Sequence, residues 1–160
     1  ALIFTYLQAK GLNMATSVAI AALMGPSQVA ARLIELANKE RHHPIWTLSI
    51  SVTMVAIGLL SLAIGSGFAA LAIILFGIGN GLFSIARGSL PLALYGRERY
   101  PSIIGDLARP WLMAQSCAPI LGILLIIFIG PQASLKCLSL FSTVNIILVL
   151  WLWKASKEIR

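Results

Sequence analysis

Residues 43–86 form a stretch of 44 consecutive positions without Asp, Glu, Lys or Arg. One short break, Gly65-Ser66-Gly67, divides this stretch into two uncharged runs, 46–64 and 68–86. A helix rises about 1.5 Å per residue, so roughly 20 residues cross the ~30 Å hydrocarbon core of a bilayer. The sequence therefore predicts two antiparallel membrane-spanning helices that are joined by a tight turn.

The rest of the chain has the same character. Hydrophobic residues make up 59% of it and charged residues 11%, which is far from the balance of a globular protein. Apolar residues run on for about 20 positions instead of alternating with polar ones over ~10, so the pattern favours helices over barrel strands. We expect an all-α integral membrane protein with five complete spans. Their approximate bounds are 12–37, 45–64, 67–93, 103–130 and 134–154.

The apolar residues 1–7 are too few to cross a bilayer, and no basic region precedes them. We interpret them as the end of another span, so the chain is expected to hold the end of one helix and five complete ones.

Basic residues are divided unevenly between the two ends of the predicted helices. Ten lie on one side, and Lys10 and Lys136 lie on the other. The positive-inside rule places the ten in the cytoplasm, which predicts a multi-pass protein of the cell inner membrane with a cytoplasmic carboxyl terminus. The net charge of +7 also suits a nucleic-acid partner. We favour topological anchors that face anionic lipid headgroups instead. The ten are Arg32, Lys39, Arg41, Arg87, Arg97, Arg99, Arg109, Lys154, Lys157 and Arg160.

The first complete span carries several polar residues on one helical face. Gly25, Gln28, Arg32 and Glu35 are spaced i, i+3, i+7 and i+10, which aligns them. Arg32 and Glu35 can pair at this spacing, either as a cytoplasmic gate or with Arg32 simply snorkelling to the interface. Gln28 lies deeper and is a candidate for a cavity or for a hydrogen bond to a neighbouring helix.

The third span holds the richest pattern. A stripe of small residues predicts close approach of a second helix; it comprises Gly77, Gly81, Ser84 and Gly88. Asn80 lies near mid-membrane, where its amide needs either a substrate or an intramembrane partner. Arg87 shares a neighbouring face and lies nearer the cytoplasmic end. It either snorkels or faces a cavity, where it would attract anionic groups.

The fourth span adds Asp106 and Arg109 at i, i+3, as further cytoplasmic gating candidates, and Gln115 as a cavity candidate. No nucleophile–base set, phosphate-binding loop or metal-ligand spacing is present in the sequence. We therefore expect no enzyme activity, no metal and no cofactor.

Two of these motifs resemble those of a known family. Gly25-Pro-Ser-Gln-Val-Ala-Ala-Arg32 resembles the second helix of the C-terminal half of bacterial major facilitator superfamily (MFS) transporters. Gly77-x-Gly-Asn-Gly, followed by Arg87-Gly-x-x-Pro91, is similar to the fourth helix of that half. The chain lacks the family's best signature, the Gly-x-x-x-Asp-Arg-x-Gly-Arg-Arg type of loop, which belongs to the N-terminal half.

The resemblance implies an MFS-type C-terminal bundle, running from the end of helix 7 through helix 12. Its partners would be the bilayer, the N-terminal half of the same transporter and a small-molecule substrate, with or without a coupled proton. Substrate would lie between the halves near the midplane and move by alternating access. The alternative is a small multi-pass membrane subunit with a structural or assembly role and no transport of its own.

Overall fold

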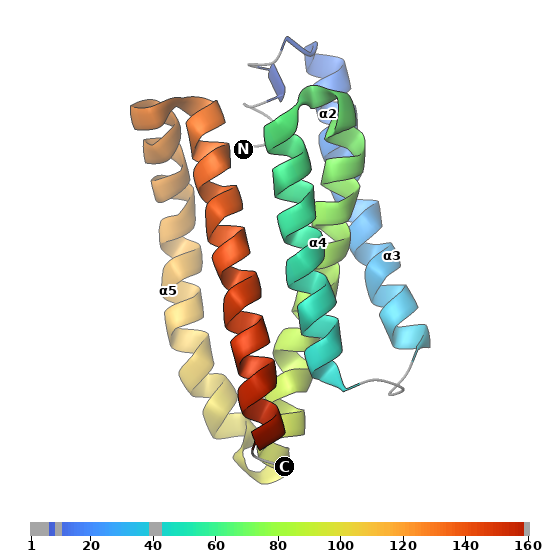
Figure 1. The fold of residues 1–160 in the computed structure, drawn as a ribbon, viewed down its shortest axis with the longest axis vertical. Helices are drawn as coiled ribbons and strands as arrows, with labels where there is room; N and C mark the ends of the chain where they lie inside the picture. Colours follow the sequence, from blue (N-terminus) through green and yellow to red (C-terminus); the bar gives the residue numbers. More distant parts are fainter. Residues whose placement is uncertain (1–6, 9–10, 39–42, 159–160) are drawn as a thin grey trace.

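The structure is a computed structural model that describes residues 7–8, 11–38 and 43–158 (Figure 1). All regular elements among these residues are helical, so the prediction of an all-α chain is confirmed. In chain order they are α2 (Met14–Ala22), α3 (Met24–Ala37), α4 (Pro44–Ile64), the short 3₁₀ helix η1 (Ser66–Phe68) and α5 (Ala69–Glu158). The helix end predicted for residues 1–7, apart from Leu7, and the basic loop residues 39–42 lie outside the described residues.

The single helix predicted for 12–37 is divided in two at Leu23. Pro26 has no N–H and cannot donate to the carbonyl of Ala22, so the regular ladder is interrupted there. The Leu23 N–H donates instead to the Ile20 carbonyl at 3.1 Å, a tighter turn than that of an α-helix. At the other end of this pair, Asn13 caps α2 by accepting a hydrogen bond from the Thr16 N–H at 2.7 Å.

Helix α4 begins and ends close to where the sequence indicates. Pro44 lies in its first turn, where the missing N–H costs nothing. The His43 ring nitrogen Nδ1 accepts a hydrogen bond from the Ile45 N–H at 3.3 Å and so satisfies one of the unpaired donors of that turn. The helix ends at Gly65, and η1 leads from there into α5.

Helix α5 consists of three helical segments, and the chain reverses direction at Gly96 and Gly130, where the backbone angles are not helical. Gly96 (φ 74°) and Gly130 (φ 77°) adopt the left-handed region that glycine tolerates best. Figure 1 shows the chain doubling back at both points. We call the three parts the first segment (69–95), the second segment (97–129) and the third segment (131–158). The predicted spans 67–93, 103–130 and 134–154 leave links of several residues between them, whereas in the structure only Gly96 and Gly130 depart from helical backbone angles there.

Two buried clusters hold the bundle together. One joins α4 and the first and third segments around Leu59, Leu62, Ala72 and Leu135. The other packs Ile45 and Leu48 of α4 against the first segment, with residues of the third segment on its flank. No described side chain between 92 and 133 is buried, so the second segment lies outside both clusters.

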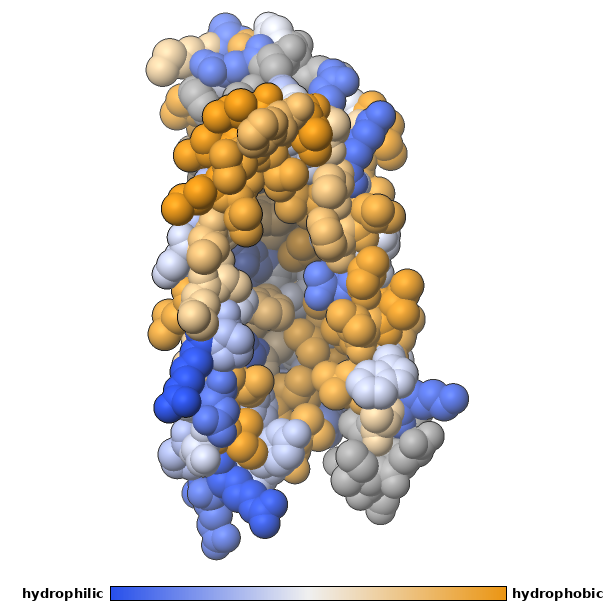
Figure 2. All heavy atoms as spheres, turned by 90° about the vertical axis from the view of Figure 1, so that its left-hand side faces the viewer, coloured by the Kyte–Doolittle hydropathy of each residue, from blue (hydrophilic) through white to orange (hydrophobic). Residues whose placement is uncertain are grey.

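Three helical stretches are long and apolar enough to cross a membrane: Met14–Ala37, Pro44–Ile64 and Ala69–Ala155, which covers nearly all of α5. Figure 2 views the side of the molecule formed by the second and third segments of α5. Apolar residues fill its upper and middle parts, and hydrophilic residues gather at the two ends. The turn at Gly96 and the carboxyl terminus share the lower end in Figure 1, while η1 and the turn at Gly130 share the upper end. This arrangement is compatible with a membrane location.

Candidate functional site

Glycines let α5 approach both of its neighbours at backbone distance. A Cβ added at Gly81 would lie 2.6 Å from the Gln28 carbonyl oxygen, and one at Gly77 would lie 2.9 Å from the Met24 carbonyl oxygen, so both face α3. Gly79 faces α4, where an added Cβ would lie 2.7 Å from the Ser51 carbonyl oxygen. The other two members of the predicted stripe differ from these. Ser84 is exposed, and Gly88 has only the Tyr100 hydroxyl nearby, at 3.8 Å.

Two hydrogen bonds between helices fix the positions of α3, α4 and the first segment of α5. The buried Ser51 hydroxyl donates to the Gly79 carbonyl at 2.8 Å. Near the basic end of the bundle, the Thr47 hydroxyl donates to the Glu35 carboxylate at 2.5 Å and ties α4 to α3. Glu35 thus bonds to Thr47, and the described residues show no ion pair between Arg32 and Glu35. Arg32 is exposed.

Arg87 contacts an aromatic ring across the hairpin of α5. Its guanidinium carbon lies 4.6 Å from the centre of the Trp111 ring, a cation–π distance. Trp111 also lies 5.9 Å from the Phe83 ring, measured between centroids, with the planes tilted by 34°. Phe83 and Arg87 are four residues apart and share a face of the first segment. The trio is therefore the contact that joins the first and second segments near their basic ends.

The predicted cavity residues Asn80 and Gln115 lie just beyond this trio. Asn80 precedes Phe83 by three residues, and Gln115 follows Trp111 by four, so each lies on the helix face that carries the contact. The two segments run in opposite directions (Figure 1), so both amides lie on the side away from Gly96. Both side chains are exposed, and neither has a hydrogen-bond partner within the described part of the chain.

The third predicted cavity residue, Gln28, is placed differently. It lies at the contact between α3 and Gly81, where its backbone makes the approach, and its side chain is half-buried.

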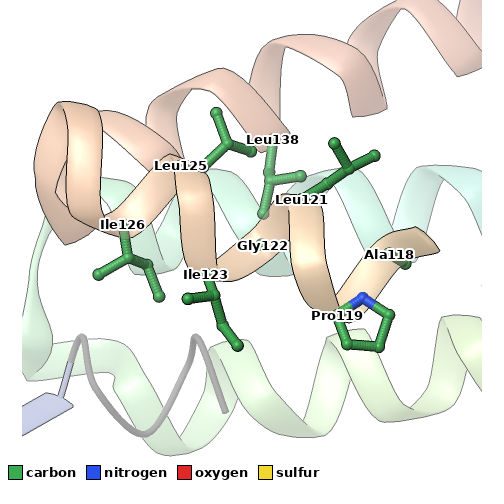
Figure 3. Close-up of a pocket in the computed structure, with 8 residues that line it drawn as sticks. All are labelled: Ala118, Pro119, Leu121, Gly122, Ile123, Leu125, Ile126 and Leu138. Atoms are coloured by element: carbon green, nitrogen blue, oxygen red, sulfur yellow. The ribbon is translucent and has the colours of Figure 1, made fainter.

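An apolar cavity of about 400 Å³ lies along the second segment, and its first lining residue, Ala118, follows Gln115 by three positions. Figure 3 shows its wall, which comes from the second segment, with Leu138 reaching in from the third. Its lining residues carry no polar side chain; they are Ala118, Pro119, Leu121, Gly122, Ile123, Leu125, Ile126 and Leu138. In Figure 2 this face is hollowed along its middle, with hydrophilic atoms in the depth of the hollow. We call Arg87, Trp111, Asn80 and Gln115, together with this cavity, the α5 hollow.

The remaining gating candidates, Asp106 and Arg109, are both exposed on the second segment, and the described residues offer neither an ion-pair partner. Neither residue belongs to the α5 hollow. No group of three or more His, Cys, Asp or Glu residues that could hold a metal is found where the chain is described. Cys117 and Cys137 are both free thiols.

Sequence reasoning missed Trp111 as a partner of Arg87 and Thr47 as the partner of Glu35. The spans predicted for 67–93 and 103–130 imply a chain reversal between Arg87 and Trp111, but 24 positions separate the two residues, and spacing along each helix does not show which side chains meet across the reversal. A signal was available in the i, i+4 spacing of Phe83 and Arg87, which offers an aromatic ring and a cation on one face.

Comparison with known proteins yields no match to any family model, to any curated protein or to any solved structure.

Proposed function

We propose that this chain is one helical bundle of a secondary transporter, arranged as the C-terminal half of an MFS permease that moves a small molecule by alternating access. The observation that supports this best is the α5 hollow, in which two unpartnered amides and an arginine lie below an apolar cavity within helices of membrane-spanning length. Polar groups at membrane depth are costly unless they face a partner, a ligand or water. A hollow of this kind suits a solute pathway better than a lipid-facing surface.

The exposure of the second segment also supports a second helical bundle as its packing partner. Its side chains are apolar over most of its length, yet none is buried within the described chain. Transporter halves of the proposed kind enclose substrate only when they pack together, with the site at their interface. In this proposal the face with the α5 hollow meets the N-terminal half, and the chain crosses the inner membrane five times: once through α2 and α3 together, once through α4 and once through each segment of α5.

The test is water access to the α5 hollow in the full-length protein. Single cysteines replace Gln115 or Met113 in a background carrying Cys117→Ser and Cys137→Ser. Met113 is two residues away on nearly the opposite face, and it is exposed. We expect a membrane-impermeant maleimide to label the Gln115→Cys variant and to leave the Met113→Cys variant unlabelled, because lipid shields the latter.

If the maleimide labels neither variant, the result would contradict a solute pathway. It would favour the alternative, a membrane subunit with a structural role. Labelling of the Gln115→Cys variant from only one side, whichever ligand is added, would contradict alternating access.

A further inference from the structure

We infer that the α5 hollow binds an elongated amphiphilic carboxylate, with its anionic head on Arg87 and its hydrocarbon chain in the apolar cavity. This inference deepens the proposed function and rests on it in one respect, namely that the hollow faces an interface and not bulk lipid. It names the chemical class of the ligand, and the geometry supplies three independent reasons for the choice.

The first reason is the state of Arg87. Its guanidinium carbon lies 4.6 Å from the centre of the Trp111 ring, and no carboxylate or hydrogen-bond acceptor contacts it among the described residues. A cation–π contact is an electrostatic attraction to the ring, so the N–H donors of this guanidinium are not engaged in hydrogen bonds within the described structure. Those donors match a carboxylate in a bidentate arrangement. The arginine is therefore held in place by an aromatic ring and still lacks an anion.

The second reason is the pair of amides. On the two facing segments, Asn80 lies about one helical turn above Phe83 and about two turns above Arg87, and Gln115 lies about one turn above Trp111. Both lack partners in the described structure. At this level they are suited to hydrogen-bond the polar end of a ligand whose carboxylate lies on Arg87.

The third reason is the cavity beyond the amides. It begins at Ala118, seven residues or about 10 Å above Trp111 along the second segment, and continues to Ile126. Its walls carry no hydrogen-bonding side chain, so they suit hydrocarbon. From the basic end upward, the side chains thus change from a cation to amides and then to hydrocarbon. A fatty-acid-like anion has the matching order of groups, with a charged head followed by an alkyl chain.

The experiment measures binding of radiolabelled dodecanoate to the full-length protein in phosphatidylcholine nanodiscs, with empty nanodiscs as background. Dodecanol and dodecyltrimethylammonium serve as competitors of the same chain length with neutral and cationic heads. We expect saturable binding that dodecanoate itself displaces. Dodecanol should be a weaker competitor by at least about tenfold, since hydrogen bonds to a charged group are worth about 1.5–3 kcal/mol. The cation should not compete.

Arg87→Gln should raise the Kd for dodecanoate by at least about tenfold. Arg97→Gln is the matched control because it removes an exposed arginine beside the Gly96 turn, outside the α5 hollow; its Kd should be unchanged. Arg87→Lys should bind nearly as poorly as Arg87→Gln, since an ammonium group lacks the planar fork.

Gly122→Leu tests where the hydrocarbon chain lies. Gly122 lines the cavity and has no atom within 4 Å of an added Cβ, so the larger side chain fills space without a clash at that position. It should weaken dodecanoate binding while binding of the short carboxylate hexanoate is retained. Gly105→Leu, at a position equally free of neighbours but outside the cavity, should change neither.

Three results would overturn the inference. They are equal competition by dodecanol, an unchanged Kd in the Arg87→Gln variant, and loss of dodecanoate binding when phosphatidylglycerol is added to the nanodiscs. The last result would assign the hollow to an anionic lipid headgroup instead. None of these results bears on water access at Gln115, so the inference and the proposed function can fail separately.

Discussion

At the scale of single residues, Gly81 decides how closely the first segment of α5 can approach α3. The nearest atom to an added Cβ is a backbone oxygen of Gln28 at 2.6 Å, and the Gln28 Cα follows at 3.1 Å. Backbone cannot move aside as a flexible side chain can. The sequence could predict this close approach from spacing alone, but it could not name the opposing helix, because spacing on one helix says nothing about its neighbours.

We expect Gly81→Ala to destabilise the protein by about 1–3 kcal/mol, the usual cost of overpacking. Gly88→Ala is the control, since its nearest neighbour is the Tyr100 hydroxyl at 3.8 Å; it should be neutral or slightly stabilising, because alanine favours helix over glycine. The measurement is thermal unfolding in detergent, followed by circular dichroism. Equal melting temperatures for the two variants would show that α3 does not pack on this face.

The hydrogen bond from Thr47 to Glu35 can be tested by its own substitution. Thr47→Val keeps the shape of the side chain and removes the donor, so we expect a loss of about 1–3 kcal/mol. Thr53→Val is the control, since Thr53 is exposed and its hydroxyl bonds only within α4, to the Ser49 carbonyl. In a double-mutant cycle with Glu35→Ala, which removes the acceptor, the Thr47→Val effect should shrink. An undiminished effect in the Glu35→Ala background would argue that Thr47 acts through packing alone.

At the scale of whole elements, the sequence predicted helix type well and helix boundaries less well. Uncharged runs of about 20 residues identify apolar helices directly, and Gly65 marks the end of α4 as expected. The break at Leu23 and the long second segment were missed for opposite reasons. Pro26 interrupts hydrogen bonds in a run that carries no charged residue, whereas the polar residues on either side of Gly96 are helical although their composition is typical of a loop. Amino-acid composition indicates which runs suit an apolar environment, but it does not fix where the helical hydrogen bonds are interrupted.

The hairpin at Gly96 gives an element-scale prediction. Phe83→Cys together with Trp111→Cys, in a background without Cys117 and Cys137, should cross-link with a short bifunctional thiol reagent, because the native rings lie 5.9 Å apart between centroids. Pairing Phe83→Cys with Met113→Cys should give little product, since Met113 lies on nearly the opposite face of the second segment. Equal cross-linking of both pairs, read as a mobility shift on denaturing gels after cleavage between the two sites, would contradict the packing of the two segments.

At the scale of the whole molecule, basic residues lie beside the chain reversals at the two ends of the bundle. The turn at Gly96, with Arg97 and Arg99 beside it, lies at the end of the bundle that also holds the carboxyl terminus (Figure 1). Lys136 lies near the opposite turn at Gly130. The chain reversals thus place Arg97 and Arg99 at one end of the bundle and Lys136 near the other. Which end faces the cytoplasm remains a prediction of the positive-inside rule.

Cysteine labelling of intact cells tests that orientation. In a background without Cys117 and Cys137, a single cysteine replaces either Asn38, the exposed residue that ends α3, or Gly67, which is exposed in η1. A membrane-impermeant maleimide added outside should label the Gly67→Cys variant and should reach the Asn38→Cys variant only after the membrane is permeabilised. The physical reason is that an odd number of crossings, α4 alone, separates the two positions. Labelling of both variants from outside would remove α4 as a membrane span. The reverse pattern would keep the span and invert the whole bundle, so that the basic end faced away from the cytoplasm against the charge rule.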